Sequence, residues 1–238
     1  MGFTEMKIAA AQIKPIENNT EANIQSHIHM IDMAAQQQVQ LIVFPELSLT
    51  GYEREKAKNL SFIENDSRLK IFNDKAEANN MLIIVGAPIT MDSTLHIGAF
   101  VFLPDGTTSI YTKQFLHDGE ELFFTPSTKY NPLIHFQNET ISLAICADIN
   151  HPMHPKQASE RKTTLYIPSI FYTPNGIAEG QSILSKYAKE YSMKVLMANY
   201  TGSSYGMSAA GQSGFWNQQG VLISQLNTHE ENLLIIEI

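Results

Sequence analysis

Short apolar runs, each long enough for one buried β-strand, alternate with helical segments throughout this chain of 238 residues. The expected strands are 7–11, 40–44, 81–86, 96–103, 107–112, 141–145, 163–167, 194–198, 214–217 and 221–225. The expected helices are 18–38, 67–79 and 178–191. Such alternation predicts an α/β fold in which helices cover the sheets. Turn residues join 96–103 to 107–112 and 214–217 to 221–225, so two hairpins should make the sheets mixed.

The longest expected helix, 18–38, contains isoleucines at helical spacing. Ile24, Ile28 and Ile31 fall on one face of this helix, and we expect that face to be buried against a sheet. At the other end of the chain, the segment 232–238 is apolar and suits either a buried strand or a subunit interface.

The composition indicates one globular domain, 1–238. Hydrophobic residues make up 43% of the chain, charged residues make up 17%, and the formal net charge is −8. An acidic protein is a poor candidate for binding nucleic acid or an anionic membrane surface, because both require a basic patch. No apolar stretch approaches the roughly 20 residues that a membrane span needs. We therefore expect a small-molecule partner.

The amino terminus and the cysteine content predict a cytoplasmic protein. The first residues have neither a basic n-region nor an apolar h-region, so we expect no signal peptide. Translation could start at Met1 or at Met6, and the sequence leaves this open. Cys146 is the only cysteine, so no disulfide can form within the chain, as expected in a reducing compartment.

Cys146 also has a position suited to chemistry, because it ends an expected strand and functional groups in α/β proteins gather at strand ends. Glu46 ends the apolar run 41–46, and Lys113 ends the strand-like run 109–113. A lone cysteine is usually a small buried hydrophobe, and lone charged residues are usually solvated. Three such residues after three strands favour a catalytic group instead.

These three side chains have complementary roles in attack on a carbonyl carbon. The thiolate is the nucleophilic form of cysteine, and Glu46 can accept the thiol proton provided that burial raises its pKa. Lys113 would stabilise both the thiolate and the oxyanion that forms on attack, and the backbone N–H of Ala147 is a second donor to that oxyanion. This chemistry requires no metal and no organic cofactor.

Three segments around these residues resemble the signature motifs of the nitrilase superfamily of carbon–nitrogen hydrolases. Phe44–Tyr52 resembles the glutamate motif, Tyr111–Glu120 the lysine motif and Ile145–Asp148 the cysteine motif, in the order found in the family. Four further segments are similar to family motifs: Ala9–Gln12, Ile167–Ser169, Ala198–Tyr200 and Gly211–Ser213. The resemblance therefore runs almost from end to end of the chain.

This resemblance implies a four-layer α-β-β-α sandwich with two mixed β-sheets and a catalytic triad of Glu46, Lys113 and Cys146. It implies hydrolysis of a non-peptide C–N amide bond through a Cys thioester, without a cofactor. A second glutamate often follows the lysine in the family. Glu120 fits best because it begins a Glu-x-x-Phe-Phe-x-Pro segment, and Glu121 is the alternative. The resemblance also implies a homodimer of stacked sandwiches.

Four residues are expected to contact the substrate: Tyr52, Ala147, Ile170 and Phe171. The chain departs from the family pattern at Phe115, where a histidine is common, at Ala147, where an aromatic residue is common, and at 149–152. These departures lie close to the expected pocket, so the resemblance leaves the substrate open among amides, N-carbamoyl compounds, ω-amides and nitriles. A non-catalytic binding protein on the same scaffold is a further alternative.

The segment 170–175 favours a small neutral acyl group, because it is mostly apolar and aromatic. A carboxylated substrate would require an arginine. Only three arginines are present, and Arg161 alone lies near the cysteine segment in the sequence. We therefore expect a neutral amide, with Arg161 as the residue on which the carboxylated alternative depends.

Two other motifs suggest different chemistry. Gly202–Gly206 fits the G-x-S-x-G pattern around Ser204, but His229 is the only downstream histidine and no acidic residue lies between them. His151 and His154 have the spacing of metal ligands, but no nearby residues complete a tetrahedral set, so we expect solvated loop histidines.

Overall fold

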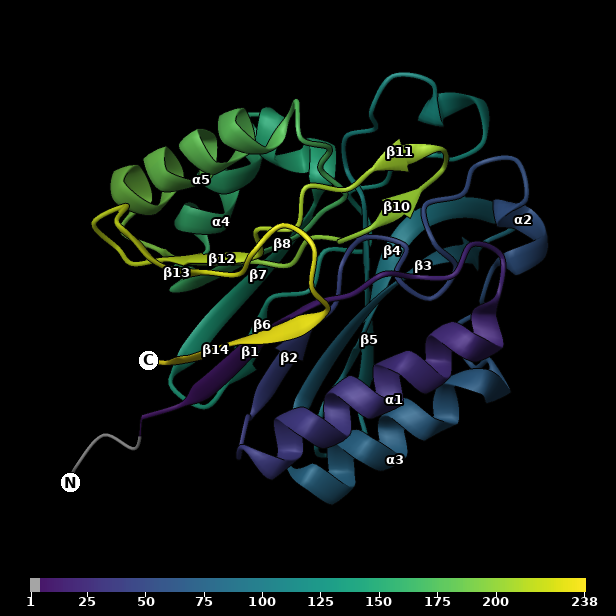
Figure 1. Cartoon of the computed structure of the whole chain (residues 1–238), viewed down its shortest axis with the longest axis horizontal. Coiled ribbons are helices and arrows are strands. Elements are labelled where there is room, and N and C mark those ends of the chain that lie inside the picture. Colours follow the sequence, from purple (N-terminus) through teal and green to yellow (C-terminus); the bar gives the residue numbers. More distant parts are fainter. Residues whose placement is uncertain (1–4) are drawn as a thin grey trace.

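In a computed structural model, which describes residues 5–238, two six-stranded β-sheets pack face to face (Figure 1). Met1, one of the two candidate starts, lies outside the described residues. Met6 is paired with Ile238 through two backbone hydrogen bonds of 2.9 Å, so the two ends of the described chain lie side by side.

The first sheet has the order β14-β1-β2-β3-β4-β5. Its strands are β1 (Lys7–Gln12), β2 (Leu41–Val43), β3 (Leu82–Met91), β4 (Thr94–Phe102), β5 (Thr108–Thr112) and β14 (Asn232–Glu237). Strands β1, β2 and β3 are parallel, and the other neighbours pair antiparallel. The first sheet is therefore mixed, and β4 and β5 form the first expected hairpin.

The second sheet has the order β13-β12-β9-β8-β7-β6. Its strands are β6 (Ile134–Phe136), β7 (Glu139–Ile145), β8 (Leu165–Ser169), β9 (Lys194–Met197), β12 (Gly214–Trp216) and β13 (Leu222–Gln225). Strands β7, β8 and β9 are parallel, and the other neighbours pair antiparallel. The second expected hairpin, β12 and β13, is confirmed.

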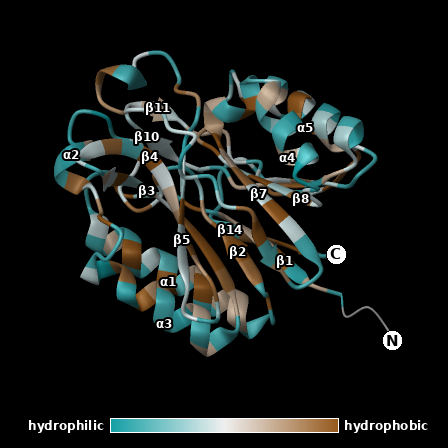
Figure 2. Ribbon diagram, turned by 180° about the vertical axis from the view of Figure 1, so that it is seen from behind, coloured by the Kyte–Doolittle hydropathy of each residue, from teal (hydrophilic) through white to brown (hydrophobic). Residues whose placement is uncertain are grey.

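Helices cover the outer face of each sheet. The longer helices are α1 (Thr20–Gln36), α3 (Lys70–Asn79), α4 (Met153–Glu160) and α5 (Ile177–Tyr191). Helices α1 and α3 lie on the first sheet, and α4 and α5 lie on the second (Figure 1). Figure 2 shows hydrophobic strands between helices whose outer surfaces are hydrophilic. The expected four-layer α-β-β-α sandwich is confirmed.

Side-chain alternation along the strands produces three apolar layers. In β1, Ile8 and Ala10 join the core between the sheets, whereas Ala9 and Ala11 join the core under α1 and α3. In the second sheet, Ala144 of β7 packs in the layer under α4 and α5. Both faces of each sheet are therefore buried, as continuous apolar runs require.

Helix α1 buries only part of the expected face, because Ile31 alone of the three isoleucines is fully buried. Ile24 and Ile28 are only partly buried, whereas Asn23 and His27 are almost inaccessible. The Asn23 Oδ1 atom accepts the Ile16 N–H at 2.7 Å, and its Nδ2 atom donates to the Ile16 carbonyl oxygen at 2.8 Å. The polar atoms of this side chain are therefore satisfied inside the fold. Hydrogen bonding therefore allows polar residues to share the buried face of this helix with Met30, Ile31 and Ala34.

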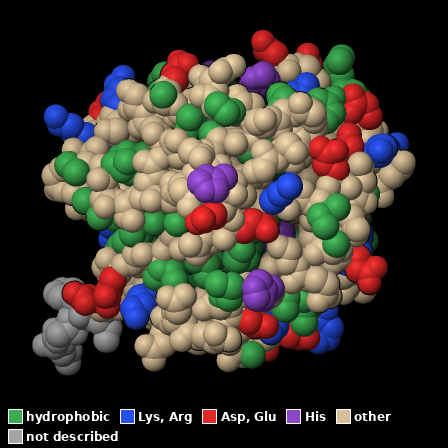
Figure 3. All heavy atoms as spheres, in the orientation of Figure 1, with side chains coloured by type: hydrophobic (Ala, Val, Ile, Leu, Met, Phe, Trp, Pro, Cys, Tyr) green, Lys and Arg blue, Asp and Glu red, His purple; other side chains and the backbone are tan. Residues whose placement is uncertain are grey.

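The carboxyl-terminal segment forms β14, which pairs antiparallel with β1. Its apolar residues therefore belong to a strand of the first sheet. Around edge strand β13, Val221, Leu222 and Ile223 are 53%, 40% and 53% exposed. Figure 3 shows hydrophobic side chains gathered on the face where β13 and β14 lie. No helix within residues 5–238 is both long and apolar enough to cross a membrane.

Candidate active site

Glu46, Lys113 and Cys146 follow β2, β5 and β7, so the first sheet supplies two of these side chains and the second sheet supplies one. The Lys113 ammonium lies 2.7 Å from Glu46 Oε1. The side chains of Lys113 and Glu46 are fully buried. The structure therefore brings the charged pair together at the edge where Cys146 begins its turn.

The Glu46 loop is held close to β3. A Cβ atom on Gly86 would lie 2.3 Å from the Pro45 carbonyl oxygen, so glycine is required for this approach. The Tyr200 hydroxyl donates to the Glu46 carbonyl oxygen at 2.6 Å. Leu47 has a φ of 51°, in the left-handed region that non-glycine residues rarely adopt. Packing from both sheets thus fixes the carboxylate.

Glu46 has the environment of a general base. Burial raises the pKa of its carboxyl group to about 7, although the charge of Lys113 acts in the opposite direction. Its Oε1 atom accepts from Lys113, whereas Oε2 is buried and has no hydrogen-bond partner among residues 5–238. The free oxygen and the raised pKa suit proton exchange near neutral pH.

Lys113 remains a cation despite its burial. Burial alone would lower the pKa of its ammonium, but Glu46 and Glu120 raise that pKa well above the ordinary value. Lys113 Nζ lies 2.9 and 2.8 Å from the two Glu120 oxygens. Glu121, the alternative second glutamate, is exposed. Lys113 is therefore a fixed positive charge between two carboxylates.

Glu120 is itself oriented by two donors. The Tyr52 hydroxyl donates to Glu120 Oε1 at 2.7 Å, and the His117 backbone N–H donates to Oε2 at 2.8 Å. Glu120 is almost completely buried. Its position suits it to orient Lys113.

Cys146 begins a 3₁₀ turn, Cys146–Asn150, with a φ of 42°. A non-glycine residue in this region is strained, and such strain gathers at functional sites. Burial raises the pKa of the Cys146 thiol well above its ordinary value, and the charge of Glu46 adds to this effect. Lys113 and the backbone of Phe171 act in the opposite direction. The resting sulfur is therefore a thiol that needs a base.

Asp148 connects the lysine and cysteine segments. Its Oδ1 atom accepts the backbone N–H groups of Gln114 and Phe115 at 2.9 and 2.8 Å. Its Oδ2 atom accepts from Ile145 N at 2.8 Å and from the Tyr111 hydroxyl at 2.6 Å. One buried carboxylate thus fixes the backbone on both sides of the site. Sequence analysis missed this role.

The expectation of solvated loop histidines is wrong for His154, which lies in α4 and is 4% exposed. Its ring nitrogens lie 2.8 Å from the hydroxyls of Tyr111 and Tyr166. Burial lowers the pKa of His154, so it is a neutral part of the network around Asp148. His151 is exposed and stacks on Phe115 at 3.8 Å.

A cavity of about 480 Å³ opens onto Cys146. Of the four residues expected to contact substrate, Tyr52 and Phe171 line this cavity. Ala147 is buried directly beside Cys146. Ile170 does not line the cavity, contrary to expectation, because it points into the core under α5 while Phe171 points into the core between the sheets.

The arginine that lines the cavity is also not the one expected. Arg161 donates to the Asn131 carbonyl oxygen and does not line the cavity, whereas Arg54 does. His117 and Glu179 line it as well, so the wall is less apolar than 170–175 suggested. Arg54 lies two residues after Tyr52, the last residue of the glutamate motif. This closeness in sequence is the feature from which its place at the cavity could have been predicted.

The serine-nucleophile interpretation lacks its structural context. Ser204 lies in the two-residue strand β10 (Ser203–Ser204), which pairs with β11 (Met207–Ser208) and does not lead into a helix. Its buried Oγ atom accepts the Tyr52 N–H at 3.0 Å. A nucleophile elbow requires a strand-to-helix turn that exposes the serine.

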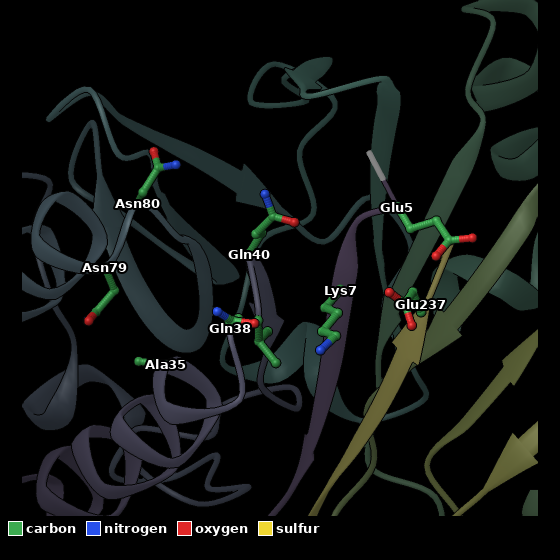
Figure 4. A pocket seen from close by; sticks show the side chains of 9 residues that line it. Glu5, Lys7, Ala35, Gln38, Gln40, Asn79, Asn80 and Glu237 are labelled. Carbon is green, nitrogen blue, oxygen red and sulfur yellow. The ribbon is translucent and has the colours of Figure 1, made fainter. Parts of the chain in front are cut away.

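A second cavity, of about 440 Å³, lies at the opposite ends of the strands (Figure 4). Lys7 and Gln40 from the starts of β1 and β2 line it, together with Asn79, Asn80 and Glu237. Glu46 follows the other end of β2, so this polar cavity is separate from the Cys146 site.

Two mixed sheets between helical layers, with a Glu–Lys pair beside a strand-end cysteine, define the class of protein. The chain belongs to the carbon–nitrogen hydrolase family, whose model matches residues 7–238. A nitrilase of Pyrococcus abyssi is 23% identical over 98% of this chain and 89% of its own length.

Another relative is the glutamine-dependent NAD(+) synthetase of Acinetobacter baylyi, which is 24% identical over 97% of this chain. The chain spans only 44% of that relative's length. A solved glutamate-to-glutamine mutant of an amidase from Nesterenkonia sp. AN1 has a TM-score of 0.90 at 20% identity, covering 100% of this chain and 92% of that one. It carries the acetamide moiety of fluoroacetamide on its active-site cysteine. The similarity shows a common fold.

Proposed function

We propose that this chain hydrolyses the C–N amide bond of a small molecule, with Cys146 as the nucleophile. The observation that carries the proposal is the buried pair of Lys113 and Glu46, 2.7 Å apart. Both charges act on the pKa of Cys146, which itself lines the cavity. A buried carboxylate with one free oxygen and a fixed ammonium match the base and the oxyanion stabiliser of acyl transfer.

In the first half-reaction, the Cys146 sulfur attacks the amide carbonyl carbon while the thiol proton passes to Glu46. The developing oxyanion is stabilised by Lys113 and by the backbone N–H of Ala147. Glu46 then returns the proton to the departing nitrogen, the C–N bond breaks, and ammonia or an amine leaves. The product on the enzyme is a thioester at Cys146.

In the second half-reaction, Glu46 removes a proton from water as the water oxygen attacks the thioester carbonyl. Collapse of the oxyanion breaks the C–S bond, the proton returns to sulfur, and the carboxylic acid is released. Glu120 orients Lys113 through both of its oxygens, and Tyr52 and Phe171 flank the substrate. The proposed steps use water together with side chains and one backbone N–H of this chain.

The family relatives support this proposal without fixing the substrate. The mutant Nesterenkonia amidase carries a covalent acetamide adduct on its active-site cysteine, which supports a nucleophilic role for the cysteine here. The nitrilase relative makes a nitrile the second candidate substrate. N-carbamoyl compounds and ω-amides are further candidates. A reactive free thiol suits the reducing cytoplasm, which is the compartment we propose.

Ammonia release from a panel of amides, ureido acids and nitriles tests the function. The wild-type protein should release ammonia from amides, and Cys146→Ala should release none while keeping its circular dichroism spectrum. Rapid quenching during turnover should add the acyl mass to Cys146. Full activity in Cys146→Ala would disprove the proposal. Slow alkylation of Cys146 by iodoacetamide with no turnover would favour the binding-protein alternative.

We also propose a homodimer with small-molecule substrates. Support comes from the family resemblance and from the exposed apolar side chains around β13. The segment 232–238 no longer argues for an interface, because β14 pairs with β1 inside the chain.

A further inference from the structure

Arg54 is the one permanently charged cation among the described residues that line the Cys146 cavity. It lies in the loop after β2, beside the Tyr52 that orients Glu120. Glu179 of α5 supplies the one carboxylate on the lining, and His117 lies on the lysine segment. The cavity therefore contains a cation that the chemistry at Cys146 does not use.

The Arg54 guanidinium is held in place by neutral groups. Its Nε and Nη2 atoms donate to the Tyr52 hydroxyl at 3.2 and 2.9 Å, and its Cζ lies 5.3 and 5.4 Å from the ring centres of Tyr52 and Tyr205. Gly119 permits this placement: its φ is +85°, and a Cβ there would lie 2.7 Å from Nη1. The surrounding residues thus fix the position of the guanidinium.

The guanidinium also has unused hydrogen-bonding capacity. It has five N–H donors in a planar fork. One on each of Nε and Nη2 is directed at Tyr52, and one on Nη1 is directed at the Asp118 carbonyl oxygen at 3.4 Å. None of the ion pairs among residues 5–238 includes Arg54. One N–H on each terminal nitrogen therefore remains for a ligand.

We propose that Arg54 binds a carboxylate on the acyl part of the substrate, so that the site prefers ω-monoamides of dicarboxylic acids to neutral amides. The inference rests on the proposed amide hydrolysis and replaces the expectation of a neutral acyl group. A carboxylate is the planar acceptor that fits two forked N–H groups. Glu179 repels an anion on the α5 wall, which restricts the carboxylate to the Arg54 side.

Two substrates of equal length test the preference. Butyramide and succinamate differ only in a terminal methyl or carboxylate group. Wild-type kcat/KM should favour succinamate by at least about tenfold, and methyl succinamate, which is uncharged, should lose that advantage. A charge-assisted hydrogen bond of this kind corresponds to a factor of about 10 to 100. Equal rates, or a preference for butyramide, would overturn the inference.

Arg54→Gln keeps a donor for Tyr52 and removes the charge. It should reduce the succinamate-to-butyramide ratio of kcat/KM by about 10- to 100-fold, mainly through KM. Using the ratio cancels any general damage that reaches Glu120 through Tyr52. Arg161→Ala is the matched control, because this arginine lies outside the cavity, and it should leave the ratio unchanged. An unchanged ratio in Arg54→Gln would contradict the proposal.

A binding measurement separates this inference from the proposed function. In Cys146→Ala protein, calorimetry should detect succinamate binding that is stronger than butyramide binding, and adding Arg54→Gln should abolish the difference. This result can be obtained even if no amide is turned over, in which case only the proposed function fails. Turnover of amides with no Arg54-dependent difference in binding would disprove the carboxylate site alone.

Discussion

The Asp148 carboxylate accepts the backbone N–H of Gln114 at 2.9 Å and thereby joins the segment of Lys113 to the turn that begins at Cys146. Because its other oxygen accepts from Ile145 N, one side chain holds the backbone beside two proposed catalytic residues, one from each sheet. Asparagine at 148 would direct an N–H group at one of these donors, so the two segments should move apart.

We therefore expect Asp148→Asn to lower kcat by about 10- to 100-fold with KM changed less than threefold, since a misplaced nucleophile impairs chemistry more than binding. Steady-state kinetics checks this split. Asp92→Asn is the control, because Asp92 is exposed and bonds only Lys129 and Tyr130 on the surface. Equal losses in kcat for both variants would show that the hydrogen bonds of Asp148 have no effect on catalysis.

Glu46→Gln and Lys113→Ala should each lower kcat/KM by about 100-fold or more, the scale of one general base or one oxyanion donor. Lys113→Ala should also lower the melting temperature, because it leaves Glu46 and Glu120 buried without their cation. Initial rates and thermal unfolding test both statements. A rate loss below tenfold would remove the residue concerned from the proposed triad.

The pH dependence of kcat/KM should follow the ionisation of Glu46. Burial raises the pKa of this group to about 7, and the base acts in its deprotonated form. Activity should therefore rise between pH 5 and pH 8, with a midpoint near 7. Glu46→Gln should retain only a low rate without this rise. A wild-type profile that is flat from pH 5 to pH 8 would contradict the assignment of Glu46 as the base.

Stability should depend on pH through His27. Burial lowers its pKa to about 4, from an ordinary value of 6.5. The folded state thus binds this proton less tightly than the unfolded state, so stability present above pH 6.5 is lost as the pH falls towards 4. The shift corresponds to at most about 3 kcal/mol in the free energy of unfolding.

Denaturant titrations of the wild type and His27→Gln test this dependence. The difference between their unfolding free energies should shrink as the pH falls from 6.5 to 4. His29→Gln is the matched control, since His29 is an exposed residue of the same helix, and its difference from the wild type should not vary with pH. A constant difference for His27→Gln would show that the buried ring does not control acid stability.

The proposed homodimer predicts a particle of twice the 26.6 kDa chain mass in light scattering at micromolar concentration. Exposed apolar side chains on the unpaired edge around β13 are costly to leave in water and would be covered by a partner. A mass that stays at that of one chain over a hundredfold range of concentration would refute the dimer.

Apolar runs predicted an α/β fold with covered sheets, because both sheets contain parallel strands buried on two faces. The four-layer arrangement was expected from the family resemblance. The sequence did not predict α4, because Pro152 and Pro155 suggested a loop, although Pro152 is the N-cap residue of that helix. The burial of Asn23 and His27 also could not be predicted, since their acceptors and donors come from backbone and side chains distant in the sequence.

In the candidate site, too, some residues could be predicted from the sequence and others could not. Strand ends and motifs predicted Glu46, Lys113 and Cys146 as candidates, because Lys113 and Cys146 directly follow β5 and β7 and Glu46 lies shortly after β2. Residues on loops and on α5 were harder to place. Ile170 and Phe171 are adjacent in sequence but point into different cores, and Arg54 reaches the cavity although 92 positions separate it from Cys146 in the sequence.

Glu46 and Lys113 are supplied by one sheet and Cys146 by the other, so the proposed reaction takes place across the junction of two halves that could each keep their own strands and helices. The turnover rate would then report on how closely the two sheets are packed against each other. A substitution such as Leu143→Ala, within the layer between the sheets, could silence the enzyme while leaving its helical and strand content intact. In a chain built this way, catalysis would be among the first properties lost when the fold begins to loosen.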